Sequence, residues 1–459
     1  MNQPSNSGVL VVSVDWDCHP SCQHGPTVLF QRYTKDNSTS RQFYACSACR
    51  DRKDCSFFQW ADDKLSCERL AMRKQVSEAF HSEKSMQEEQ QLILRKCLDS
   101  KDYQNKYCTT CGLLLPPGEC LNHVNHNVKN VSVSDLTQPT AIIRAHTNNK
   151  MEAQYFFSRQ TLSFLMATFK ELSIDSVLCI GTPTIHEVCV NQGVISSYLL
   201  DIDQRYEQFY PVNKFSRFNM FNRHFFNGEK GADNVDLILH KQNLAIIIDP
   251  PFGGLAELLG GTLQHFMKRW KTLHAREKRE LPIFWVFPYF LEEKVKENLP
   301  NVVMLDYVVD YANHSSFKSD KKRKSPVRIF TNVCAERIAL PKEQGYCYCN
   351  ECHRWVTSEN KHCSVCNVCP SKDGNPWKHC FKCSKCVKGS REHCDTCQHC
   401  VLPKHICGEL AKSKAGCHMC GDIGHKKRDC PKVTAASHRG KWKKRSLGQK
   451  KGNAKKMKR

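Results

Sequence analysis

Short apolar runs alternate with amphipathic segments over residues 141–340, and this pattern predicts a domain in which strands and helices alternate. Runs rich in β-branched residues are typical of buried strands, and helical patterns separate them. The predicted strands are residues 176–180, 198–202, 244–248 and 283–287, followed by a hairpin of residues 302–305 and 327–331. The predicted helices are residues 160–172, 184–191 and 255–278. Such alternation predicts an α/β fold with a mostly parallel sheet that helices cover on both faces.

The predicted strand at residues 244–248 runs directly into Asp249-Pro250-Pro251-Phe252. Two prolines cannot continue a strand ladder or a helix, so the chain leaves the sheet in a rigid, extended turn. Open α/β sheets bind their ligands at such carboxyl ends of strands. The Asp249 carboxylate and the Pro250 carbonyl can accept the two hydrogens of an exocyclic amine, while the Phe252 ring can stack on a planar base. An ordinary structural turn is the alternative for so short a motif.

This motif resembles the Asp/Asn-Pro-Pro-Tyr/Phe motif of Rossmann-like class I amino-methyltransferases. Those enzymes use S-adenosylmethionine to methylate N6 of adenine, N4 of cytosine or a glutamine amide. The resemblance implies a class I methyltransferase sheet at residues 141–340. The catalytic residues that it implies are Asp249, Pro250, Pro251 and Phe252.

Three further segments resemble cofactor-binding elements of the same enzymes. The turn at Gly181 resembles a degenerate first motif of S-adenosylmethionine enzymes, and acids at the end of the next strand can accept hydrogen bonds from a ribose diol. Asp201 is favoured for that role and Asp203 is next; a solvated turn acid is the alternative. Residues 154–157 resemble a segment folded over the methionine end of the cofactor, with an aromatic core cluster as the alternative. The predicted cofactor-binding residues are Gln154, Tyr155, Phe156, Phe157, Gly181, Asp201, Asp203 and Asp249.

The charge and the cysteine content indicate that the chain also binds nucleic acid and metal ions, in addition to the predicted enzyme domain. The 459 residues carry a net charge of +22, which favours a polyanionic partner such as RNA, and they include 29 cysteines and 21 histidines. Residues 1–14 do not resemble a secretory leader, and no window approaches 18 consecutive apolar residues. Cysteines in a reducing compartment, clustered as Cys-x-x-Cys, indicate zinc ions rather than disulfides.

Residues 16–68 predict a compact zinc module with Cys22, His24, Cys46 and Cys55 as ligands and Cys18 and Cys49 as spare candidates. The segments 43–46 and 55–60 resemble the GRF-type zinc finger. Charge and aromatic residues interleave here, which suits single-stranded nucleic acid, although the rings could instead pack a small core. The residues concerned are Arg41, Phe43, Phe57, Phe58 and Trp60.

Residues 69–140 predict a long helix over 68–100 and then a Cys2His2 zinc site. Its predicted ligands are Cys108, Cys111, His123 and His126. The loop between the two pairs holds Pro116-Pro117-Gly118, unlike the usual helical DNA-reading finger. Fastening of the neighbouring domain and contact with nucleic acid are both open as roles.

Residues 345–410 repeat the pattern His-Cys-x-x-Cys-x-x-Cys three times, which predicts a module held together by several zinc ions. The predicted ligands are Cys349, Cys352, His362, Cys363, Cys366, Cys369, His379, Cys380, Cys383, Cys386, His393, Cys394, Cys397 and Cys400, and His405 and Cys407 close the series. The series resembles the cysteine-rich part of DHHC palmitoyltransferases. It lacks the Asp-His-His-Cys motif and membrane spans of that family, so we expect a zinc scaffold and no acyl transfer.

Residues 415–432 match a CCHC zinc knuckle, with ligands Cys417, Cys420, His425 and Cys430, which suits single-stranded RNA. The predicted disordered tail at 433–459 carries eleven Lys and Arg residues and no acid from Arg439 onward. It predicts phosphate binding and a nuclear or nucleolar address, with the cytoplasm as an additional location. A second basic stretch, residues 316–325, could guide RNA or be merely solvated.

Taken in order, these modules resemble the adenine-N6 methyltransferases of large-subunit, 28S-type ribosomal RNA. The resemblance implies S-adenosylmethionine and several zinc ions as cofactors and ribosomal RNA as partner. Two alternatives stay open. One is a zinc-rich RNA-binding adaptor with an inactive methyltransferase fold, and the other is a protein glutamine N-methyltransferase.

Overall fold

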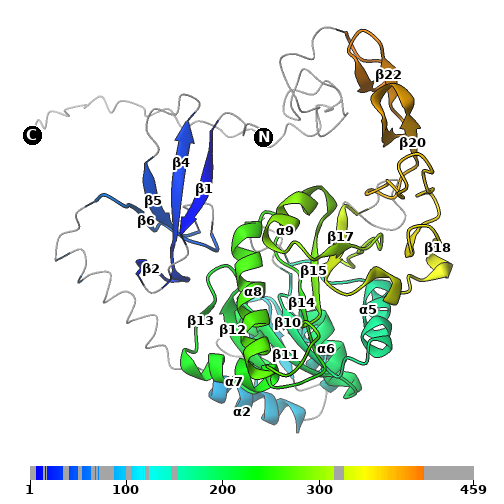
Figure 1. Ribbon diagram of the computed structural model, residues 1–459. Coiled ribbons are helices and arrows are strands. Elements are labelled where there is room, and N and C mark those ends of the chain that lie inside the picture. Colours follow the sequence, from blue (N-terminus) through cyan, green and yellow to red (C-terminus); the bar gives the residue numbers. More distant parts are fainter. Residues whose placement is uncertain are drawn as a thin grey trace, which may run out of the picture. The chain divides into compact units, whose positions relative to one another are not determined.

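A computed structural model describes residues 7–13, 16, 18–34, 41–49, 54–63, 68, 71, 87–99, 105–116, 118, 123–145, 154–314 and 325–407 (Figure 1). The chain forms two compact units, one of residues 1–360 with 372–374 and one of residues 361–371 with 375–459. The predicted CCHC knuckle and basic tail lie outside the described residues. So do the basic stretch at 316–324 and most of the predicted helix before residue 87.

The first unit contains an eight-stranded sheet in the order β13-β12-β11-β10-β14-β15-β17-β16. The strands are β10 (Ser176–Ile180), β11 (Ser196–Asp201), β12 (Phe215–Asn219), β13 (His224–Phe225), β14 (Leu244–Ile248), β15 (Ile283–Pro288), β16 (Val303–Met304) and β17 (Val327–Thr331). Strand β10 pairs in parallel with both β11 and β14, whereas β17 runs antiparallel between β15 and β16. This order confirms the predicted α/β class and puts the topological switch point between β10 and β14.

Helices cover both faces of this sheet, as the alternation of strands and helices predicts (Figure 1). The helices are α5 (Arg159–Glu171), α6 (Pro183–Gln192), α7 (Glu229–Leu239), α8 (Ala256–Leu273) and α9 (Glu292–Asn298). Val177 and Cys179 of β10 pack into one core with α5 and α6. Leu178 and Ile180 pack into another core with α7, α8 and α9. Successive side chains of a strand point to opposite faces, so a fully apolar strand serves two cores.

The predicted and observed elements agree where apolar runs are continuous and differ where they are not. The predicted strands at 176–180, 244–248 and 327–331 match β10, β14 and β17 residue for residue, and helix α8 ends at Leu273 rather than at residue 278. Strands β16 and β17 pair antiparallel, as predicted for the final hairpin pair. Strands β12 and β13 and helix α7 were not predicted.

The N-terminal zinc module is a four-stranded antiparallel sheet in the order β1-β4-β5-β6, with a small hairpin β2-β3. Its strands are β1 (Ser7–Ser13), β2 (Ser21–Cys22), β3 (Gly25–Pro26), β4 (Val28–Thr34), β5 (Gln42–Ala45) and β6 (Phe58–Trp60). Asn222, which follows β12, donates from its side-chain amide to the carbonyls of His24 and Pro26, at 2.9 and 2.8 Å. These bonds join the module to the large sheet.

The segment between this module and the large sheet holds helix α2 and a second small sheet in the order β8-β7-β9. The elements are α2 (Gln87–Leu98), β7 (Lys106–Cys108), β8 (Leu113–Leu115), β9 (Val128–Asn130), α3 (Val133–Leu136) and α4 (Pro139–Ile142). The Gln208 side chain connects this segment to the loop between β11 and β12. It accepts a hydrogen bond from the Leu114 N–H and donates one to the Gly112 carbonyl, both at 2.7 Å. Within the described part of residues 105–130 the zinc ligands sit on strands and turns, as the Pro-Pro-Gly loop predicts.

Short hairpins form in the part of the chain described after residue 345. The hairpin of β18 (Tyr346–Cys349) and β19 (Arg354–Thr357) belongs to the first unit. The second unit contains the hairpins β20 (Trp377–Cys380) with β21 (Lys385–Lys388) and β22 (Glu392–Cys394) with β23 (His399–Val401). Among the described residues, no helix combines the length and the apolar character that crossing a membrane requires.

Candidate active site and zinc centres

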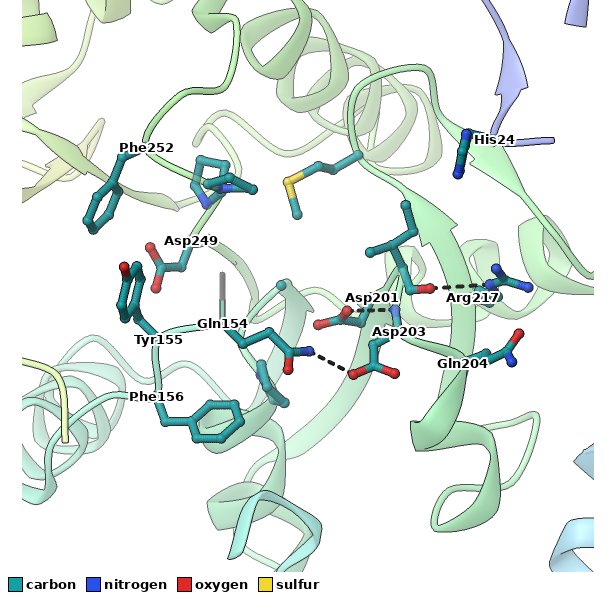
Figure 2. Close-up of a pocket in the computed structure, with 16 residues that line it drawn as sticks. His24, Gln154, Tyr155, Phe156, Asp201, Asp203, Gln204, Arg217, Asp249 and Phe252 are labelled. Atoms are coloured by element: carbon teal, nitrogen blue, oxygen red, sulfur yellow. Dashed lines mark hydrogen bonds between the residues drawn. The ribbon is translucent and has the colours of Figure 1, made fainter. Parts of the chain in front are cut away.

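The carboxyl ends of β10, β11 and β14 meet at one pocket, as expected at a topological switch point. The Gly181 N–H donates to the Leu200 carbonyl at 2.8 Å, and the Asp249 N–H donates to the Ile180 carbonyl at 3.1 Å. These bonds hold three strand ends side by side. The lining residues are His24, Gln154, Tyr155, Phe156, Gly181, Pro183, Asp201, Ile202, Asp203, Gln204, Arg217, Met220, Asp249, Pro250, Pro251 and Phe252 (Figure 2).

Asp249 is the acid at one end of this pocket. Its Oδ1 accepts a hydrogen bond from the Tyr311 hydroxyl at 3.0 Å. The carboxyl group lies deep in the fold, and this loss of water raises its pKa well above the usual range, while the Tyr311 bond acts in the opposite direction. Pro250 and Pro251 remove two backbone donors after Asp249 and keep the turn rigid.

Aromatic rings form the wall beside Asp249. The Tyr155 and Phe252 rings stack with centroids 5.6 Å apart and planes 15° apart, and Figure 2 shows both beside the Asp249 carboxylate. Tyr155 also stacks on His314, with centroids 4.3 Å apart. A flat, mostly apolar wall next to a hydrogen-bond acceptor suits a planar base that carries an amine.

Two acids occupy the other end of the pocket, and they differ in what already binds them (Figure 2). The Asp203 carboxylate accepts hydrogen bonds from Arg205 Nη2 at 2.6 Å and from Gln154 Nε2 at 2.8 Å. Asp201 accepts the Asp203 backbone N–H at 3.0 Å. Burial, with help from the charge of Asp203, raises the pKa of Asp201 to about 7. Asp203 is occupied by protein donors, so Asp201 is the better acceptor for a ribose diol.

The pocket fits a nucleoside cofactor such as S-adenosylmethionine in two respects. Gly181 has φ +63°, and a Cβ there would lie 2.9 Å from Met220 Cε and 3.1 Å from the Asp249 carbonyl oxygen. A side chain at position 181 would therefore fill the space between the strand ends, which we call the cradle around Gly181. In addition, the Asp201 carboxylate lines the pocket at the end of the second strand, a position suited to accept hydrogen bonds from a ribose diol.

The structure brings all but one of the predicted catalytic and cofactor-binding residues to this pocket. Phe157 is the exception: its side chain is 4 % exposed and stacks on Tyr311, with centroids 5.4 Å apart, so it packs behind the pocket. Phe157 therefore does not line the pocket, because the polar-aromatic run 154–157 turns into the core after Phe156. Sequence reasoning also missed Arg217, Met220 and Tyr311, which come from elements without a recognisable motif.

Two N-terminal ligand sets have the geometry of zinc sites. Each set has its four ligand atoms within 4.8 Å of one another: Cys22, His24, Cys46 and Cys55, and Cys108, Cys111, His123 and His126. In a tetrahedral zinc site neighbouring ligand atoms lie roughly 3.3–3.8 Å apart. The sulfur of Cys46 lies 3.4 Å from His24 Nδ1, and that of Cys111 lies 3.6 Å from His123 Nδ1. The spare candidate Cys49 packs beside the first set.

The aromatic residues of the first module pack on one another. The Phe43 and Phe58 rings stack at 5.1 Å, and Phe58 meets the edge of Trp60 at 4.9 Å. Arg41 lies over Trp60, 4.1 Å from its centroid, and pairs with Asp62 at 2.9 Å. These contacts favour the packing role that the sequence left open over a free RNA-stacking surface.

The second unit links its repeats by sharing ligands between them. One set joins Cys363 and Cys366 of the first repeat to His379 and Cys386 of the second, and another joins Cys380, Cys383, His393 and Cys400 in the same way. A third cluster continues the pattern: Cys394 lies 3.5 Å from Cys407, and Cys397 lies 3.5 Å from His405 Nε2. His405 and Cys407, which only closed the series in sequence, thus fit as ligands. Cys349 and Cys352 lie where the β18–β19 hairpin turns.

The comparisons with known proteins agree with this geometry. A family model described as "Probable N6-adenine methyltransferase" matches residues 148–333, and the GRF zinc finger model matches residues 20–64. Fold and site therefore define an α/β N6-adenine methyltransferase that carries zinc-binding modules.

Curated relatives narrow the class to one family. The rRNA N(6)-adenosine-methyltransferase ZCCHC4 of Homo sapiens is 43% identical over 452 residues, which span 95% of this chain and 87% of the human protein. The Xenopus tropicalis protein of the same name is 42% identical over 76% of this chain and 74% of its own length. That of Mus musculus is 42% identical over 75% of this chain and 70% of its own length. The chain belongs to the ZCCHC4 family of rRNA N(6)-adenosine-methyltransferases.

Proposed function

We propose that this protein transfers a methyl group from S-adenosylmethionine to N6 of an adenosine in large-subunit, 28S-type ribosomal RNA. One observation carries the proposal: Asp249, Pro250 and Phe252 line the same pocket as Asp201, the candidate acceptor for a ribose diol. An amine acceptor site and a nucleoside cofactor site are thus joined in one cavity. The RNA substrate rests on the names of the relatives and on the net charge of +22.

The residues that would hold the cofactor are Asp201 at the ribose and Gly181, together with Gln154, Tyr155 and Phe156, which also line the pocket. S-adenosylmethionine, when bound, supplies an electrophilic methyl group. The substrate adenine has to leave its stack to reach the pocket, and Phe252 offers the ring on which it stacks. Asp249 and the Pro250 carbonyl accept the two N6 hydrogens and leave the nitrogen lone pair free to attack.

Asp249 acts by positioning and by charge rather than as a strong base. A hydrogen-bonded carboxylate holds the amine in a reactive orientation and favours the positive charge that develops on N6. The N6 proton becomes acidic as the methyl group arrives, so no residue has to remove it beforehand. The buried walls exclude water from the reaction.

Substitution of Asp249 tests the proposal. Asp249→Ala should abolish methylation of ribosomal RNA fragments, while the cofactor affinity, measured by calorimetry, should stay within about threefold of wild type because Asp201 remains. The readout is N6-methyladenosine in the digested RNA, quantified by mass spectrometry. Full turnover by Asp249→Ala would remove Asp249 from the mechanism. Wild-type protein that binds RNA but neither binds the cofactor nor methylates the RNA would identify an RNA-binding adaptor instead.

The same proposal includes location. The acid-free basic run from Arg439 to Arg459 is the kind of segment that directs a protein to the nucleus and nucleolus. A fluorescently tagged protein should therefore concentrate in nucleoli, and removal of residues 433–459 should disperse it. Unchanged nucleolar signal after truncation would place the address elsewhere in the chain.

A further inference from the structure

Tyr311 is held rigidly although it lies outside the regular helices and strands of the sheet. Its backbone forms an isolated antiparallel bridge with Phe157, and its side chain is 3 % exposed. The ring stacks on Phe157 at 5.4 Å and contacts Tyr155 at 5.7 Å between centroids. Two neighbouring aromatic rings therefore fix the direction of the Tyr311 hydroxyl.

That hydroxyl points at the acid that receives the substrate amine. It donates to Asp249 Oδ1 at 3.0 Å. One carboxylate oxygen is thereby occupied, and Oδ2 is left for the N6 hydrogen. A carboxylate without such a partner can rotate about its terminal torsion, which is broad in energy.

We propose that Tyr311 is a positioning residue for methyl transfer, which orients the Asp249 carboxylate so that one of its oxygens is aimed at the adenine amine. This inference rests on the proposed function and deepens it, because it assigns the group that prepares the amine acceptor. Tyr311 itself does not touch the reacting atoms in this arrangement.

The electrostatics around Asp249 support the same role. Burial raises the pKa of Asp249, and the Tyr311 hydrogen bond lowers it, so the bond favours the ionised acceptor. The pKa of Tyr311 lies well above its ordinary value because of burial and the nearby carboxylate, so the hydroxyl keeps its proton. The other titratable groups around the pocket and behind Tyr311 are Tyr155, Asp201, Asp203, Arg217, His24, Asp310 and His314.

The test is Tyr311→Phe in the full-length, zinc-loaded protein. The ring and its stacking are kept while the hydroxyl is lost, so kcat should fall about ten- to hundredfold, the range for losing one hydrogen bond to a charged group. KM for RNA and the cofactor affinity should change less than about twofold. The acid limb of the pH–rate profile should move to higher pH by about one unit, because Asp249 loses the bond that keeps it ionised.

A matched control is Tyr307→Phe. Tyr307 is also buried, at 1 % exposure, and stacks on Phe164 rather than facing Asp249. This variant should keep wild-type kcat and pH profile. Thermal unfolding of both variants checks that the fold is intact.

A second readout does not need activity. In protein labelled with carbon-13 at aspartate carboxyl groups, the Asp249 resonance, assigned by its loss in Asp249→Ala, should titrate at higher pH in Tyr311→Phe than in wild type. An unchanged titration and an unchanged acid limb would overturn the role of Tyr311 even if wild type methylates RNA. A wild-type protein without methyl transfer would instead overturn the proposed function, while the titration still reports on Tyr311.

Discussion

Gly181 is a pocket residue whose backbone conformation and close neighbours both disfavour any other residue type. Its φ of +63° is unfavourable for other residues, and an added Cβ would meet Met220 and the Asp249 carbonyl oxygen at 2.9 and 3.1 Å. We expect Gly181→Ala to lower the free energy of unfolding by about 1–2 kcal/mol and the cofactor affinity by about tenfold. Thermal unfolding and calorimetry measure the two effects.

Gly193 provides the control for that experiment. It has a similar φ of +66° at the end of α6, but a Cβ there would meet nothing within 4 Å. Gly193→Ala should therefore lower stability by the backbone strain alone and leave cofactor affinity unchanged. Equal losses of affinity in the two variants would mean that the cradle around Gly181 is not a cofactor site.

We expect Asp201 to make cofactor binding dependent on pH. Its pKa is raised to about 7, so the carboxyl group gains a proton as the pH falls below 7 and then accepts ribose hydroxyls less well. We expect affinity for S-adenosylmethionine to fall by up to about tenfold per pH unit below 7, since one pKa unit corresponds to about 1.4 kcal/mol. Calorimetry at pH 6 and pH 8 measures this. Asp201→Asn should bind more weakly at pH 8 and lose the pH dependence; a variant as pH-dependent as wild type would assign the effect to another group.

The zinc-binding turns share a backbone feature. In five Cys-x-x-Cys turns of the described residues, the residue after the second cysteine has positive φ: Gly112 at +71°, His353 at +48°, Asn367 at +52°, Ser384 at +48° and Gln398 at +55°. Only the first of these is a glycine. The other four turns hold side chains in a left-handed conformation that costs roughly 1–2 kcal/mol per residue, so zinc binding has to offset that strain.

This strain predicts that the zinc turns can be improved. Ser384→Gly should slow zinc release to a chelator and raise the stability of its turn by up to about 1 kcal/mol, because glycine adopts positive φ without a steric cost. Ser384→Val should do the opposite, since a β-branched residue is the worst choice at positive φ. Zinc release followed with a colorimetric chelator separates the variants. Faster release from Ser384→Gly would show that the serine hydroxyl, not the backbone, controls the turn.

Helices and strands could be predicted where a single segment contains a recognisable pattern of apolar residues and turn residues. Strand β14 is a continuous apolar run followed by Asp249 and two prolines, so its position, and the proposal of an amine site at its end, could be read from the sequence. Strand β12 could not, because it buries Ser216 and Asn219; the Ser216 hydroxyl lies 2.6 Å from that of Tyr198. Tyr311 could not either, since its bond to Asp249 depends on how distant segments pack.

At the scale of the whole molecule, the spacing of cysteines and histidines predicts which residues are zinc ligands better than it predicts which ligands bind the same ion. The threefold repeat at residues 362–400 identified its cysteines and histidines, but not that a Cys-x-x-Cys pair binds with the His and last Cys of the following repeat. That sharing makes each zinc ion a link between two repeats rather than the centre of one. Zinc therefore takes the place of a continuous hydrophobic core along the second unit.

Separate modules also predict that RNA capture can be divided from chemistry. We expect deletion of residues 417–459 to weaken RNA binding and to flatten the dependence of log affinity on log salt. Each lost contact between a cation and a phosphate removes about 0.7 from the slope on single-stranded RNA, and the run from Arg439 to Arg459 holds eleven cations without an acid. Filter binding between low and high salt measures both effects.

The residues of the proposed active site should be unaffected by the same deletion. Asp201, Asp249 and Tyr311 are held by strand ends and by packing within residues 154–314, and a zinc knuckle needs only its own ion to fold. Cofactor affinity and thermal stability of the truncated protein should thus stay near wild type. Its rate at low RNA concentration should fall because RNA binding is impaired. Saturating RNA should restore most of the wild-type rate, because methyl transfer itself is not impaired. If saturating RNA restores nothing while the cofactor still binds, the C-terminal residues must take part in forming the active site.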